Sequence, residues 1–154
     1  MYAYQLFDKI LAEVNKAYAE MGNDIIGNAG KNLFYKMRDE GFSPNDSWRA
    51  VAGGFACVAC NDGRISYDEL RAYNAMHDEK QADYSTFFDI MSKYNKQEHR
   101  NYTIELFNRM SNPQTAYNFV MFCIAVCVVD GSVAPREESF CTSLCEVFLN
   151  RFNY

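Results

Sequence analysis

Asp62-Gly63-Arg64-Ile65-Ser66-Tyr67-Asp68-Glu69 is matched further along the chain by Asp130-Gly131-Ser132-Val133-Ala134-Pro135-Arg136-Glu137. Both segments fit the pattern Asp-Gly-x-[Ile/Val]-x-x-x-Glu, and both follow a mostly apolar run. Glycine is common just after a helix, and glutamate is favoured in the first turn of the next one. Each segment therefore predicts a joint between two helices that carries carboxylates. We call residues 62–69 the first acidic joint and residues 130–137 the second acidic joint.

Apolar residues that recur every three to four positions predict helices on both sides of the joints. The clearest stripe covers residues 5–21, and residues 77–83 are expected to form a polar loop. Further helices are expected at about 28–40, 44–61, 67–77, 85–95, 101–110, 113–129 and 135–152. No segment alternates at period two, so the sequence predicts an all-α fold of seven or eight helices in a single domain, residues 1–154.

The helices before the two joints also begin alike. Ser43-Pro44 precedes the first Asp-Gly by about the same distance as Asn112-Pro113 precedes the second. A polar cap followed by proline is typical of a helix start. The chain therefore contains two helical-hairpin units, residues 43–77 and 112–152, which we expect to pack together in a pseudo-twofold relation.

Two interpretations of the joints stay open, one architectural and one chemical. In the first joint, Ser66 and Glu69 form a capping box, which explains both residues without any ligand. In the second joint, Ala134 replaces the serine, so the reciprocal box cannot form, although Asp130 and Glu137 are retained. The chemical interpretation is that the carboxylates of both joints bind a divalent cation together.

A metal site built from these joints would not be an ordinary EF-hand. Each joint matches the second half of an EF-hand loop, but the positions for the first two ligands fall on side chains without oxygen, namely Val58, Cys60, Val126 and Val128. A cation would thus need ligands from both joints, the candidates being Asp62, Glu69, Asp130 and Glu137. A site made of oxygen atoms favours Ca²⁺, Mg²⁺ or Mn²⁺ over Zn²⁺.

The duplicated pattern with its upstream prolines resembles the TerB-like family of tellurite-resistance proteins over residues 43–150. The resemblance implies an all-helical, non-enzymatic stress-response protein with an acidic patch that binds metal ions. It also implies a protein partner, in particular a membrane-associated protein of the TerC type, or a role as an interaction module. Carried over by position, the patch consists of Asp62, Glu69, Asp130 and Glu137, with Asp68 and Glu138 close by. Ala134 departs from the family pattern, in which serine is usual.

Composition limits the remaining functions. A net charge of −5 without a basic cluster argues against nucleic acid as a partner. The longest apolar run covers only residues 119–129, whereas a transmembrane helix needs about 20 apolar residues. The N-terminus has no visible signal peptide, so we expect a cytoplasmic protein whose six cysteines are thiols.

The cysteines occur in pairs, Cys57/Cys60, Cys123/Cys127 and Cys141/Cys145. Such spacings suit zinc or disulfide chemistry, because each pair lies on one helix face. All three pairs lie among apolar residues, however, where cysteine behaves as a small core residue, and this is the interpretation we favour.

The histidines give no sign of catalysis. His77 and His99 lie in polar stretches without a neighbouring nucleophile pattern. The sequence also contains no glycine-rich phosphate loop and no H-E-x-x-H motif. We therefore expect no enzymatic activity, and we expect Trp48 to anchor packing.

Overall fold

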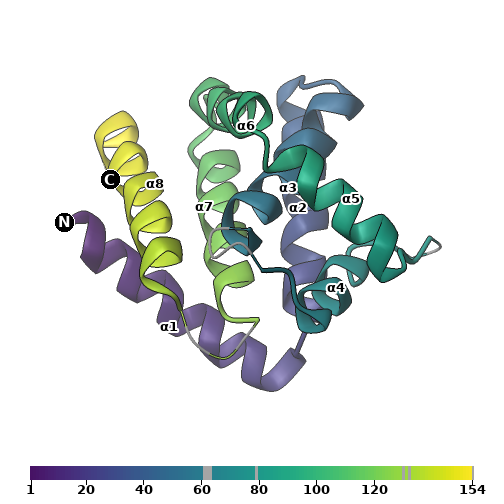
Figure 1. Ribbon diagram of the computed structural model, residues 1–154. Coiled ribbons are helices and arrows are strands. Elements are labelled where there is room, and N and C mark those ends of the chain that lie inside the picture. The colour runs from purple at the N-terminus through teal and green to yellow at the C-terminus, as the bar shows by residue number, and fades with distance from the viewer. Residues whose placement is uncertain (61–63, 79, 130, 132, 154) are drawn as a thin grey trace.

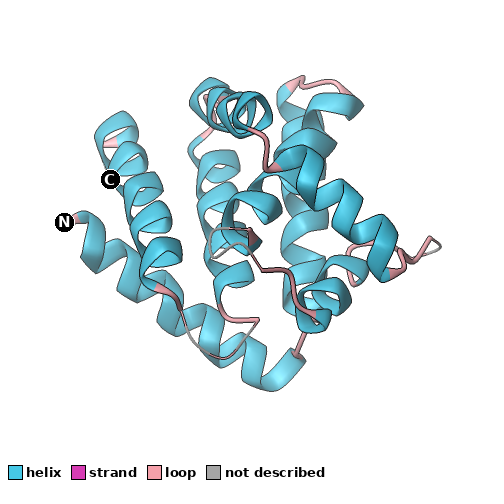
Figure 2. Cartoon of the chain, in the orientation of Figure 1, coloured by secondary structure: helices cyan, strands magenta, loops and turns pink. Residues whose placement is uncertain are grey.

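The computed structural model describes residues 1–60, 64–78, 80–129, 131 and 133–153. Within these residues the chain forms eight α-helices and no strand, so the all-α prediction is confirmed (Figure 1, Figure 2). The helices are α1 (Ala3–Met21), α2 (Asp24–Glu40), α3 (Pro44–Ala59), α4 (Tyr67–Asn74), α5 (Tyr84–Tyr94), α6 (Gln97–Arg109), α7 (Pro113–Cys127) and α8 (Pro135–Phe152). None of them, over the residues described, is both long and apolar enough to cross a membrane.

The predicted helix caps are confirmed. The Ser43 hydroxyl accepts a hydrogen bond from the backbone N–H of Asp46 at 3.1 Å, and Asn112 Oδ1 accepts one from the N–H of Gln114 at 2.9 Å. These bonds satisfy N–H groups that have no partner inside the helix. The matching starts of α3 and α7 therefore arise from the same local chemistry.

Two helices begin earlier than the sequence predicted. Helix α2 begins at Asp24 rather than residue 28, and α6 begins at Gln97 rather than residue 101. Helix α2 includes Gly27, although glycine weakens helices. A Cβ atom at Gly27 would collide with the carbonyl oxygen of Ala75, just after α4. Tertiary packing thus explains a glycine that helix propensity disfavours.

Helix α7 lies at the centre of the molecule. Figure 1 shows it between α8 on one side and α2 and α3 on the other, with α1 passing below. Its buried side chains are Thr115, Ala116, Phe119, Val120, Phe122, Cys123, Ile124, Ala125, Val126 and Cys127. Because apolar residues cover nearly its whole circumference, α7 requires neighbours on all sides.

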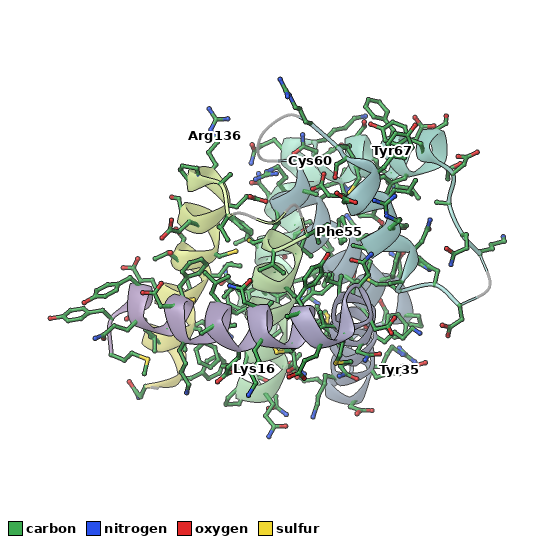
Figure 3. All side chains as sticks on the ribbon, turned by 90° about the horizontal axis from the view of Figure 1, so that it is seen from below. Lys16, Tyr35, Phe55, Cys60, Tyr67 and Arg136 are labelled. Atoms are coloured by element: carbon green, nitrogen blue, oxygen red, sulfur yellow. The ribbon has the colours of Figure 1, made fainter. Side chains whose placement is uncertain are left out.

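Helices α3 and α7 run side by side in the same direction. Near their starts, Glu40 at the end of α2 accepts hydrogen bonds from the N–H groups of Ser111 and Asn112, at 2.9 and 3.0 Å. Further along, the rings of Phe55 and Phe122 lie with their centroids 6.5 Å apart. Phe55 points into the centre of the molecule in Figure 3. The two helices that precede the acidic joints therefore end on the same side of the fold.

Candidate functional site: the two acidic joints

In the sequence, the first acidic joint follows α3 and the second follows α7. Viewed from below, Cys60 at the end of α3 and Arg136 in α8 lie toward the same side of the molecule (Figure 3). Glu69 and Glu137 belong to the first turns of α4 and α8. Asp62 and Asp130, the other two predicted ligands, lie outside the described residues.

The first joint forms the predicted capping box. Glu69 Oε1 accepts a hydrogen bond from the N–H of Ser66 at 2.8 Å, and the Ser66 hydroxyl accepts one from the N–H of Glu69 at 3.1 Å. The Glu69 side chain is only 4% exposed. Burying a carboxylate without a partner would be costly, and this backbone bond offsets part of that cost.

Helix α5 also holds the first joint in place. The hydroxyl of Tyr84 donates a hydrogen bond to the carbonyl oxygen of Ile65 at 2.7 Å. The Tyr84 ring lies against that of Tyr67, with the centroids 4.8 Å apart. Helix α5 therefore contacts the first joint at Ile65 and Tyr67.

The second joint forms one of the two hydrogen bonds of a capping box. Glu137 Oε1 accepts a hydrogen bond from the N–H of Ala134 at 2.8 Å, whereas the alanine side chain has no atom that could accept one in return. Gly131 has a φ of +84°, which favours glycine. Glu137 thus has an architectural role that the sequence pattern alone did not reveal, and the two glutamates are held in the same way.

The positions of three valines in the structure argue against an ordinary EF-hand, as the sequence did. Val58 and Val126 lie within α3 and α7, and Val128 follows α7; all three side chains are buried. They occupy the places where an EF-hand needs oxygen ligands. The two acidic joints are therefore connections between packed helices and not calcium loops of that type.

Metal-ligating side chains do not cluster anywhere in the described part of the chain, which includes Glu69 and Glu137. No three His, Cys, Asp or Glu side chains of residues 1–60, 64–78, 80–129, 131 and 133–153 are grouped as a metal site would require. The described residues thus supply Glu69 and Glu137 as separate ligand candidates.

The cysteines are buried, as the sequence predicted. All six are free thiols within the core. Burial raises the pKa of Cys57 to about 11 and that of Cys145 to about 12, so both thiols are protonated at neutral pH. The structure adds one contact that the sequence pairs did not suggest, because Cys127 and Cys141 face each other with their sulfur atoms 3.4 Å apart.

His77 lies in the predicted loop after α4, and its ring belongs to an aromatic cluster. Its ring centroid lies 4.9 Å from that of Trp48 and 4.9 Å from that of Tyr73. Burial, followed by the charge of Lys31, lowers the pKa of His77, which Asp78 partly counteracts. These contacts confirm Trp48 as a packing residue.

Comparisons of the chain with protein-family models, with curated proteins and with solved structures found no significant match.

Proposed function

We propose that the protein is a non-enzymatic, cytoplasmic domain of the TerB-like type, in which the two acidic joints together bind a divalent cation as part of a stress response. The observation that supports this proposal is the parallel packing of α3 and α7. It brings the ends of both helices, after which the joints follow in the sequence, to one side of the fold. In this proposal, carboxylates that are far apart in the sequence share one site.

The way in which the glutamates are held also supports the proposal. Each uses Oε1 to accept a backbone hydrogen bond at 2.8 Å within its own helix turn. A carboxylate has about four acceptor positions, so one such bond is compatible with metal ligation. Because the side chains are already ordered, binding would cost less conformational entropy.

The chemistry of the four carboxylates selects the cation. Asp62, Glu69, Asp130 and Glu137 provide only oxygen ligands. Such hard donors suit Ca²⁺, Mg²⁺ and Mn²⁺. The net charge of −5 further favours a cation over an anion.

Calorimetric titration with CaCl₂, MgCl₂ and MnCl₂ tests this function. We expect one cation per chain, with binding weakened at least tenfold by Asp62→Asn and by Asp130→Asn. Glu69→Gln and Glu137→Gln should also weaken binding, because glutamine keeps the capping bond but removes the charge. Glu146→Gln removes one charge from an exposed position of α8 and should leave the affinity unchanged. Absence of binding at millimolar cation would refute the proposal.

Exposed aromatic side chains favour a second candidate function, that of an interaction module. Tyr67 in α4 is 64% exposed and Phe88 in α5 is 49% exposed, and these two helices pack against each other. Exposed aromatic residues are typical anchors of protein interfaces. The resemblance implies a membrane-associated TerC-type partner. A binding titration with such a purified protein should show weaker binding for Phe88→Ser, and equal affinity of wild type and variant would contradict this use of α5.

A further inference from the structure

Five of the six cysteines lie buried in α3, α7 and α8, and α3 and α8 each pack against α7. They are Cys57, Cys123, Cys127, Cys141 and Cys145. Burial, followed by repulsion from the thiolates of Cys57, Cys127 and Cys145, raises the pKa of Cys123 well above its ordinary value. A Cβ atom at Gly54 of α3 would lie 3.4 Å from the sulfur of Cys123. The sulfur atoms thus form a cluster within the core.

One pair in this cluster is in direct contact. Cys127 is the last residue of α7, and Cys141 lies in the second turn of α8. Their sulfur atoms are 3.4 Å apart, and a disulfide bond requires a separation of about 2.05 Å. Small rotations about the side-chain bonds would bring the sulfur atoms together, since the two helices already pack against each other.

We propose that Cys127 and Cys141 form an intramolecular disulfide when the protein meets a small hydroperoxide such as hydrogen peroxide. One of the two sulfur atoms attacks a peroxide oxygen, so an S–O bond forms, the O–O bond breaks and one water leaves with the thiol proton. The other thiol then attacks the sulfur of the resulting sulfenic acid, so the S–S bond forms, the S–O bond breaks and a second water leaves. The two thiols lose two electrons, and one peroxide is reduced to two waters.

The surroundings of the pair determine how fast the thiols react and which oxidant can reach them. The hydrogen bond with Cys127 lowers the pKa of Cys141, but burial outweighs it and keeps this pKa above its ordinary value. The hydrogen bond with Cys141, followed by burial, raises the pKa of Cys127. Because both pKa values are raised, the reaction should be slow at neutral pH and faster at higher pH. Since both side chains are at most 1% exposed, a water-sized oxidant is required.

The bond would close a loop around the second acidic joint. The residues between Cys127 and Cys141 include the whole of that joint. A cross-link restricts the unfolded chain and thereby favours the folded state. The oxidised protein should melt roughly 5 °C or more above the reduced protein, given the length of the loop and the size of the chain.

Mass spectrometry of the peroxide-treated full chain tests the inference. After treatment at pH 8.5, denaturation and alkylation, the intact protein should contain a species that has lost two hydrogens and carries two fewer alkyl groups. Cleavage after arginine separates residues 110–136 from residues 137–151. The two peptides should be linked, fragmentation should place the link between Cys127 and Cys141, and dithiothreitol should release it.

Variants identify the reacting pair. Cys141→Ala should abolish the link, while Cys145→Ala, which changes an equally buried cysteine one turn further along α8, should leave it intact. A link through Cys123 or Cys145 in the wild type would overturn the inference. So would a wild-type protein in which all six thiols are still alkylated, or are converted only to oxygen adducts. The linked peptides of the wild-type protein test the inference even if a variant fails to fold.

Discussion

The aromatic rings of Phe55 and Phe122 lie with their centroids 6.5 Å apart at the contact between α3 and α7. Each ring belongs to the helix that leads into an acidic joint, so the contact joins the two repeat units of the chain. Together with the hydrogen bonds from Ser111 and Asn112 to Glu40, it fixes the two helices in parallel. The proposed cation site depends on this packing, because antiparallel helices would place the joints at opposite ends.

Gly27→Ala should destabilise the protein by about 2 kcal/mol, as expected for an overpacked contact. The added methyl group would meet the backbone carbonyl of Ala75, which cannot move without shifting the segment after α4. Urea unfolding measures the change. Asn28→Ala is the matched control, because Asn28 is the next residue of α2 and is exposed. An unchanged midpoint for Gly27→Ala would show that α2 does not approach this segment closely.

Ala134→Ser should stabilise the protein by up to about 1 kcal/mol, since a serine hydroxyl can accept the N–H of Glu137 and complete the capping box. The backbone at Ala134 has φ −70° and ψ 150°, close to the values at Ser66. Conversely, Ser66→Ala should cost about 1 kcal/mol. Both changes can be measured by urea unfolding. A destabilising Ala134→Ser would mean that the second joint cannot adopt the arrangement of the first.

Much of the fold follows from local sequence patterns. Ser43 and Asn112 begin helices as their chemistry predicts, and the capping box of Ser66 and Glu69 forms with both of its hydrogen bonds. These features depend on residues within one helix turn of each other. Local chemistry is therefore sufficient to predict them.

The features that sequence patterns missed depend on packing between distant elements. The early part of α2 contains Gly27, whose role appears only when α2 lies against Ala75. The contact of Cys127 with Cys141 requires the angle at which α8 returns along α7. The single capping hydrogen bond of Glu137 could have been predicted, because a glutamate in the third helical position can cap the backbone even when the serine is missing.

His77 should make stability depend on pH. Its pKa is lowered in the folded protein by burial and Lys31, so the unfolded chain, with a pKa near 6.5, binds a proton more readily. Stability should therefore be complete above pH 6.5 and should fall as the pH drops from 6.5 toward the folded pKa. Urea unfolding at pH 7.5 and pH 5 measures this loss, which should be smaller in His77→Phe.

Replacing Lys31 tests the electrostatic part of this explanation. Lys31→Met removes the positive charge that opposes protonation, so the pKa of His77 should rise toward its ordinary value. An NMR titration of the imidazole C–H signals measures this pKa directly. A His77 pKa that is unchanged in Lys31→Met would leave burial as the sole cause of the shift.

The most direct test of the central claim is an NMR titration with substoichiometric Mn²⁺, which broadens the amide signals of residues close to the ion. If the two joints share one cation, the amide signals of residues 66–69 should broaden together with those of Ala134, Arg136 and Glu137. Asp130→Asn should then reduce the broadening in both segments, while Glu146→Gln should leave it unchanged. Broadening at one joint only, or broadening of residues 66–69 that persists in Asp130→Asn, would contradict a shared site.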